Sequence, residues 1–230
     1  MSYTVMMRYI LLLALAFTPS VTVEQGFEYQ TVELRGWTVH FEQVLVEDKE
    51  LYSEVESLLQ AKLREIDSRL PPKVVIELRK VPIYFHLNRG DNPGACYHPS
   101  AQWLSEHDLP VKWARSVEFG VAKNFLTWIH DQPSMVLHEM SHAYHHRVLG
   151  YKHAGVLAAY ANAMEKELYK EVAYVRGGVV PGYASTNEME YFAETSEAYW
   201  GTNDQFPFVR GELMSHDAEM VKVLGEAWAK

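Results

Sequence analysis

The chain has 230 residues, of which 48% are hydrophobic and 22% are charged, and it contains 13 Gly, 10 Pro and one Cys. These proportions are close to globular averages and exclude collagen-like, coiled-coil and intrinsically disordered classes, while a single cysteine excludes an internal disulfide. The chain has 21 Lys and Arg residues and 30 Asp and Glu residues, which gives a net charge of −9. Because phosphate binding needs clustered basic side chains, we expect no nucleic-acid partner.

In the first twenty residues, a basic residue, an apolar run and a turn-forming segment follow one another as in a secretory signal peptide. Arg8 is followed by a short apolar run from Tyr9 to Phe17, and Thr18-Pro19-Ser20 then ends it. The run is shorter than the ~20 residues that span a bilayer. We therefore predict a signal peptide over 1–20 and a secreted, periplasmic or otherwise extracytoplasmic mature chain without a transmembrane segment. A buried N-terminal strand or helix is the alternative. In such an oxidising compartment the lone Cys96 is better suited to a buried position.

The residues after this segment alternate between strand and helix patterns. Alternating polarity around Trp37 predicts one or two strands, and a helical repeat of leucines predicts a helix that the pair Pro71-Pro72 ends. A run rich in β-branched residues predicts another strand, followed by a Gly- and Asn-rich loop and a short edge strand that tolerates proline. These elements cover 31–47, 50–70, 73–87, 89–94 and 95–99.

From Ser116 onward the pattern is helical. Pro133 stands near the start of one predicted helix and Gly150 just after its end, as helix boundaries favour. The predicted helices cover 116–130, 133–149, 154–172, 186–200 and 210–229. The sequence thus indicates an α+β fold in one domain over 21–230, with a small N-terminal mixed sheet and a helical C-terminal half.

The strongest motif is His138-Glu139-Met140-Ser141-His142, an H-E-x-x-H run in a predicted helix. Residues four apart share a helix face, so the two imidazoles can converge on one Zn²⁺ ion. Glu139 then points beside the ion, where it suits a general base for the water that the zinc activates. A solvated histidine-rich helix face, extended by His145 and His146, is the competing interpretation.

A catalytic zinc site of this kind needs a third protein ligand and one open position. A metzincin-type third histidine would require Gly at position 145 and His at position 148, where the chain has His145 and Val148. The other source is a carboxylate on the helix predicted over 186–200. Glu190 and Glu194 share a face of that helix, so one can bind zinc while the other orients an imidazole that binds it. The further glutamates there are Glu188 and Glu197.

The H-E-x-x-H motif and the later run Glu190-Tyr191-Phe192-Ala193-Glu194 together resemble the gluzincin metallopeptidases, in the branch similar to the anthrax lethal factor catalytic domain. The resemblance covers about 133–200 and implies a zincin-like fold. It implies His138, His142 and Glu190 as ligands of one Zn²⁺ per chain, with Glu194 orienting an imidazole.

The same resemblance implies Glu139 as the catalytic base and places Tyr183 near the scissile carbonyl. A phenol there can donate to the oxygen on which charge develops, and the surrounding Gly178, Pro181 and Gly182 predict a loop. The stretch 151–185 departs from the family, and nothing resembles the translocation or receptor-binding modules of a toxin. Specificity for mitogen-kinase kinases is not implied.

We therefore expect a secreted, monomeric zinc metallopeptidase that hydrolyses a peptide or protein substrate in extended form. Tyr97-His98 on the predicted edge strand could pair with such a substrate, although His98 is equally well explained as structural. One alternative is a catalytically degenerate zinc-binding protein of the cell envelope or exterior. A purely structural zinc site is disfavoured because such sites have four protein ligands, commonly cysteines, and Cys96 lies in the other half of the chain.

Overall fold

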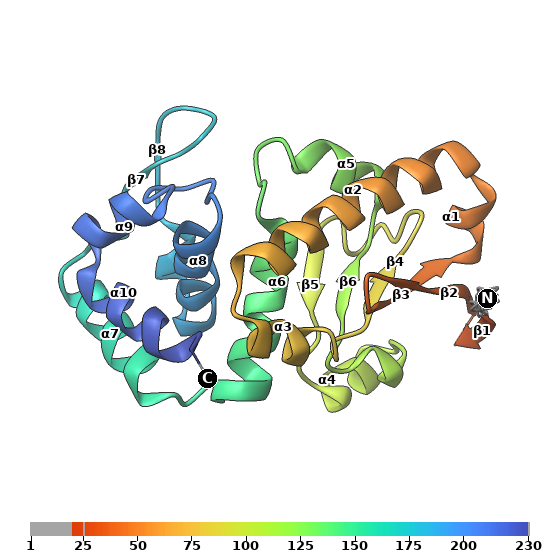
Figure 1. Cartoon of the computed structure of the whole chain (residues 1–230), viewed down its shortest axis with the longest axis horizontal. Helices are drawn as coiled ribbons and strands as arrows, with labels where there is room; N and C mark the ends of the chain where they lie inside the picture. Colours follow the sequence, from red (N-terminus) through yellow and green to blue (C-terminus); the bar gives the residue numbers. More distant parts are fainter. Residues whose placement is uncertain (1–19, 25, 230) are drawn as a thin grey trace, which may run out of the picture.

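The structure is a computed structural model that describes residues 20–24 and 26–229. The predicted signal peptide over 1–20 lies outside the described residues except for Ser20, which begins the first strand. The fold is a mixed α+β arrangement. Figure 1 shows a sheet with its covering helices on one side, a helical cluster on the other, and helix α6 between them. In the described part of the chain, the structure contains no helix that is both long and apolar enough to cross a membrane.

A six-stranded mixed sheet forms the N-terminal half, in the order β1-β2-β3-β4-β6-β5. The pairs β1–β2, β2–β3 and β6–β5 are antiparallel, whereas β3–β4 and β4–β6 are parallel. The strands are β1 (Ser20–Glu24), β2 (Phe27–Leu34), β3 (Trp37–Glu42), β4 (Ile83–Phe85), β5 (Ala95–Tyr97) and β6 (Val117–Phe119). The predicted edge strand is confirmed, because β5 ends the sheet.

The two faces of the sheet have different character because successive residues of a strand point to opposite sides. Phe41, Phe85 and Phe119 are in register and stack on the apolar face. Helix α2 (Lys49–Arg69) supplies a leucine-rich stripe to the same core and crosses the sheet in Figure 1. On the other face, Tyr84 packs near Trp113 in the one-turn helix η1 (Val111–Trp113). The remaining helices of this half are α1 (Gln43–Glu47), α3 (Pro72–Leu78), α4 (Ala101–Glu106) and α5 (Ala122–Trp128).

The C-terminal half is a helical cluster whose core is aromatic. The Trp228 ring stacks on Tyr144 at a centroid distance of 4.3 Å and on Phe192 at 5.6 Å. Its indole nitrogen donates to Ser196 Oγ at 3.1 Å, so the end of the chain is fixed to both helices that carry the motifs. The elements are α6 (Met135–Tyr144), η2 (His145–Leu149), α7 (Ala154–Glu165), β7 (Val172–Ala173), β8 (Val179–Val180), η3 (Tyr183–Ser185), α8 (Glu188–Trp200), α9 (Arg210–His216) and α10 (Ala218–Ala227).

Two predicted elements have the wrong type over part of their length. The strand predicted over 73–87 begins as helix α3, because Pro72 occupies the first helical position, where its missing N–H costs nothing. Only Ile83–Phe85 of that range is strand. The helix predicted over 116–130 begins as strand β6, which lies between β4 and β5 and becomes helical only at Ala122.

Other predictions have the right type but the wrong ends. Helix α7 stops at Glu165, before Glu167 with its φ of 54°. The helix predicted over 210–229 divides at Asp217, whose carboxylate caps α10 by accepting from Met220 N. The range 31–47 contains the end of β2, all of β3 and also helix α1. The helices predicted over 133–149 and 186–200 are confirmed in type, the first one ending as π-helix η2 before Gly150.

Candidate metal centre

Helices α6 and α8 run antiparallel and carry the motif residues. Near one end of the pair, Ser134 Oγ accepts a hydrogen bond from Thr202 N at 3.0 Å. A Cβ on Gly201 would lie 2.4 Å from Ser134 Oγ, so this approach requires a residue without a side chain. At the other end, Asn187 caps α8 by accepting from the backbone N–H groups of Met189 and Glu190. The start of α8 is thereby fixed beside the second half of α6.

This packing brings three of the predicted residues together. His138 Nε2 lies 3.1 Å from His142 Nε2, and each of these nitrogens lies 3.2 Å from Glu190 Oε2. All three residues are partly buried. Two imidazole nitrogens and one carboxylate oxygen therefore form an almost equilateral triangle, and the three residues form a group that could hold a metal ion.

The size of the triangle can be compared with that of a zinc site. Zinc binds imidazole nitrogen and carboxylate oxygen at about 2.0–2.2 Å, and the corners of a regular tetrahedron of that size are roughly 3.3–3.6 Å apart. The observed separations of 3.1 to 3.2 Å are slightly shorter than this, by roughly 0.1 to 0.5 Å. The donor set of two histidines and one glutamate is also one that catalytic zinc uses. The residues present thus fit a zinc ion with a fourth position left for another ligand.

Two further carboxylates lie near the other ring nitrogen of His138, Nδ1. His138 Nδ1 donates to Glu197 Oε1 at 2.6 Å, while Glu194 Oε1 is 3.6 Å away. Glu194 Oε2 instead accepts from Asn203 Nδ2 at 3.1 Å. His138, Glu194 and Glu197 also form a group that could hold a metal ion. However, 2.6 Å is a hydrogen-bond length and is well short of the spacing between zinc ligands. The hydrogen bond that orients His138 therefore comes from Glu197, a residue to which we assigned no role from the sequence.

Burial and hydrogen bonding perturb these groups in opposite directions. Burial opposes protonation of His138, but its hydrogen bonds with Glu190 and Glu197 outweigh this effect and hold its pKa well above the ordinary value. Burial also raises the pKa of Glu190, yet the two imidazoles reverse the shift and hold that pKa below its usual range. Burial, and then the like charge of Glu197, raise the pKa of Glu194. In the absence of metal, the protonated imidazole of His138 thus supplies the positive charge at the centre of these carboxylates.

The other predicted residues lie around a cavity of about 330 Å³ beside the triangle. Glu139, 93% buried, lines this cavity together with His138 and Tyr183. Tyr183 belongs to η3, is 48% exposed, and its ring centroid is 6.4 Å from that of His138. Its backbone N–H donates to Gln205 Oε1 at 2.6 Å, which fixes the loop that carries it. We call this space the site cavity.

Glu188 and the neighbouring histidines lie elsewhere. Glu188 begins α8 and belongs to none of the groups that could hold a metal among the described residues. His145 is fully buried against Tyr151 and Phe192, and His146 Nδ1 lies 2.9 Å from the Tyr97 hydroxyl. The histidine-rich helix is therefore not a solvated face.

Cys96 and His98 meet Glu118 from the neighbouring strand. His98 Nε2 lies 2.7 Å from Glu118 Oε2, and the partly buried Cys96 Sγ lies 3.8 Å from the same oxygen. These three residues could also hold a metal ion by their spacing. However, Arg89 Nη1 already donates to both oxygens of Glu118, at 2.8 and 3.0 Å. A guanidinium in this position opposes a second cation, so His98 is a structural partner of Glu118.

Comparisons of the chain with protein-family models, with curated proteins and with solved structures found no match.

Proposed function

We propose that the protein is a zinc metallopeptidase of zincin-like fold, of the gluzincin type, with His138, His142 and Glu190 holding one Zn²⁺ ion. The observation that carries this proposal is the triangle of two imidazole nitrogens and one carboxylate oxygen with sides of 3.1 to 3.2 Å. Its corners come from two helices that are antiparallel and fixed at both ends. The donors are therefore arranged before any ion binds, which favours a site of defined geometry.

The groups around the triangle suit hydrolysis of a peptide bond. A bound zinc ion would supply Lewis acidity, which lowers the pKa of a water molecule and polarises a carbonyl. Glu139, which lines the site cavity beside His138, would take the proton of the attacking water and deliver it to the leaving nitrogen. Tyr183, on the same cavity, would donate its hydroxyl proton to the oxygen on which negative charge develops.

The sheet supports binding of an extended substrate. Strand β5 is an edge of the sheet, and Ala95 at its start lines the site cavity. A peptide added to this edge by main-chain hydrogen bonds would run past the triangle. The proposed substrate is a peptide or protein outside the cytoplasm, since we also propose that residues 1–20 are a secretory signal.

The decisive experiment separates metal binding from turnover in two variants of the same helix. Glu139→Gln should retain stoichiometric zinc, because residue 139 is not a ligand, and should lose nearly all hydrolysis of a mixed peptide library. His142→Ala should lose both. Zinc is measured by elemental analysis after reconstitution. Purified wild-type protein that took up no stoichiometric zinc would overturn the proposal, as would equal loss of zinc from both variants. A wild-type protein that held zinc but cleaved no peptide would point to the catalytically degenerate alternative.

A further inference from the structure

The site cavity is larger than a metal ion needs, and its lining is partly apolar and partly polar. It extends from β5 and α5 to the segment after α8, and at about 330 Å³ it could hold roughly ten water molecules at ~30 Å³ each. Trp128 and Met135 form apolar parts of its wall, while Gln132, Asp204 and Gln205 contribute polar groups. A long side chain with an apolar stem and a polar end would match both kinds of lining.

Asp204 is the most unusual of these residues. It is 92% buried, and its carboxylate accepts one long hydrogen bond, from Gln132 Nε2 to Oδ2 at 3.3 Å. Its other polar contact is with its own backbone N–H. A buried carboxylate is costly unless it is fully paired, and burial raises the pKa of Asp204, more than the Gln132 hydrogen bond and the charge of His138 lower it. Asp204 lines the site cavity, so a cationic ligand in that cavity can add a charged donor to these neutral ones.

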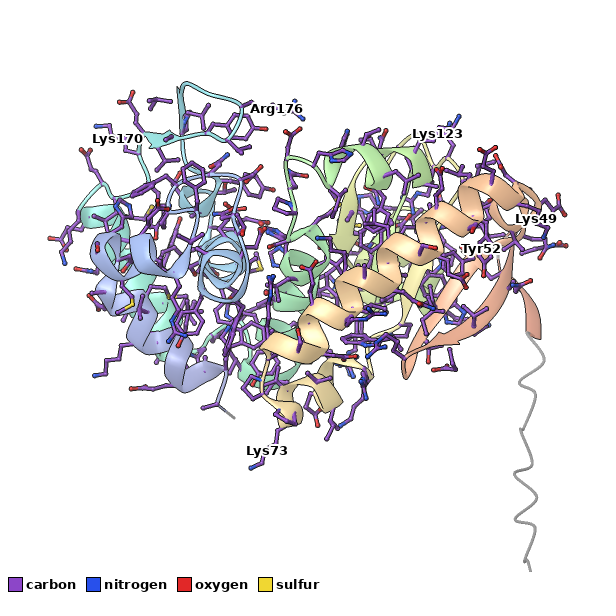
Figure 2. The ribbon with its side chains drawn as sticks, turned by 45° about the horizontal axis from the view of Figure 1, so that its top comes forward. Lys49, Tyr52, Lys73, Lys123, Lys170 and Arg176 are labelled. Atoms are coloured by element: carbon purple, nitrogen blue, oxygen red, sulfur yellow. The ribbon has the colours of Figure 1, made fainter. Side chains whose placement is uncertain are left out.

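No lysine or arginine of the described residues lines the site cavity. The nearby Arg176, on the loop between β7 and β8, is engaged outside it, because its Nε donates to Asp131 Oδ2 at 2.8 Å. Figure 2 shows Lys49, Lys73, Lys123 and Lys170 at the periphery of the molecule, directed away from its centre. Apart from His138, whose charge acts on Asp204, the described lining of the site cavity has no basic side chain, whereas it has four carboxyl groups, those of Glu139, Glu194, Glu197 and Asp204.

We propose that the site cavity binds the arginine or lysine side chain of a substrate residue next to the scissile bond, with Asp204 as its ion-pair partner. The inference rests on the proposed peptidase function and specifies its substrate class. The aliphatic stem of the bound side chain would pack against Met135. A guanidinium or ammonium group could also lie over the ring of Trp128, where a cation is attracted by the electrons of the indole.

Two measurements test this inference. The first is kcat/KM of the zinc-loaded protein on fluorogenic peptides that vary the residues on both sides of the cleaved bond. Peptides with Arg or Lys at one of these positions should be the best substrates. Asp204→Asn should lower kcat/KM for them by about 10- to 100-fold, the range expected for a hydrogen bond to a charged group. Peptides with a neutral residue there should change by less than about threefold. Asp108→Asn is the matched control, because Asp108 is exposed and asparagine tolerates its φ of 56°. This variant should leave kcat/KM unchanged for both the basic and the neutral peptides.

The second measurement does not require catalysis. Calorimetry with n-butylguanidinium, on the protein with and without zinc, should detect binding that Asp204→Asn abolishes and Asp108→Asn retains. If Asp204→Asn does not fold, Trp128→Leu provides the second test, with an expected loss of about 3- to 30-fold in affinity for the same probe.

The outcomes separate the two proposals. Preference for a neutral or acidic residue, or a basic preference unchanged by Asp204→Asn, overturns the inference, and so does absence of probe binding. Probe binding that depends on Asp204, in a zinc-loaded protein that cleaves no peptide, supports the cation-binding cavity and overturns the peptidase.

Discussion

Glu197 accepts a hydrogen bond from His138 Nδ1 at 2.6 Å, on the side of the imidazole opposite to Glu190. This contact fixes the orientation of the ring and directs Nε2 toward His142 and Glu190. A carboxylate in this position also makes the imidazole more basic and a better metal ligand. Glu197 is 96% buried, so water competes little for the hydrogen bond.

We therefore expect Glu197→Ala to weaken zinc binding by about 10- to 100-fold, the usual effect of removing the group that orients a ligating histidine. Glu194→Ala should weaken it less, because Glu194 Oε1 is 3.6 Å from Nδ1 and its other oxygen is engaged by Asn203. Competitive zinc titration of both variants measures the difference. A larger loss for Glu194→Ala would assign the orienting role to that residue, as the family resemblance implies.

Glu190→Ala should reduce zinc affinity more than either of these changes, because it removes a corner of the triangle. Glu188→Ala is the matched control on the same helix. Residues two apart on a helix point ~200° away from each other, so Glu188 cannot face the same ion as Glu190. The same titration should give a value near wild type for Glu188→Ala. Equal losses for these two variants would mean that the triangle is not the metal site.

Tyr183→Phe should lower kcat by about 100- to 1,000-fold, the usual effect of removing one donor to a developing oxyanion. KM and zinc content should remain within about twofold of wild type, since the aromatic ring remains and Tyr183 is not a predicted zinc ligand. Tyr174→Phe is the control because Tyr174 also lines the site cavity. Steady-state kinetics on one peptide measures both. If the two variants behaved alike, the Tyr183 hydroxyl would have no special role.

Acid should destabilise the fold through His145. Burial lowers the pKa of this histidine from 6.5 to about 3, so the unfolded chain binds a proton in that interval and the folded chain does not. The free energy of unfolding therefore falls with decreasing pH, by up to ~1.4 kcal/mol per pH unit from this one group. The contribution is largest above pH 6.5 and is lost as the pH approaches 3.

His145→Leu tests this effect because it removes the titrating group at similar volume. Urea unfolding of the metal-free protein, with and without the substitution, gives the difference at each pH between 7 and about 4. We expect the variant to gain stability relative to the parent as the pH falls. A difference that did not depend on pH would show that His145 is not buried in neutral form.

The sequence predicted which residues form the triangle, but it did not predict which carboxylate orients His138. His138, Glu139 and His142 are contiguous on one helix, so their relative positions follow from helical geometry alone. Glu197 was not predicted because the four-residue spacing pairs Glu190 with Glu194. Residues seven apart differ by only ~20° in direction, so Glu190 and Glu197 share a face, and that spacing was a readable signal.

The errors in the fold have a common physical origin. Val117-Glu118-Phe119 is too short a run to show a period, and its strand character comes from pairing with β4 and β5, which are distant in sequence. Val74 and Val75 favour a strand by their branching but are buried as one face of α3. Asp204 could not be predicted as a site residue from the sequence, because its place in the site cavity depends on the path of the chain after α8.

The brevity of β5 also bears on the solubility of the protein. An open edge is a template on which a second chain can grow a sheet, and proteins limit this hazard by keeping such edges short or interrupting them with proline. Here the edge spans only Ala95–Tyr97, with Pro93 before it and Pro99 after it. Three residues offer too few main-chain hydrogen bonds to hold a neighbouring copy without other contacts. The edge can therefore lack a neighbouring strand without making the molecule prone to aggregate.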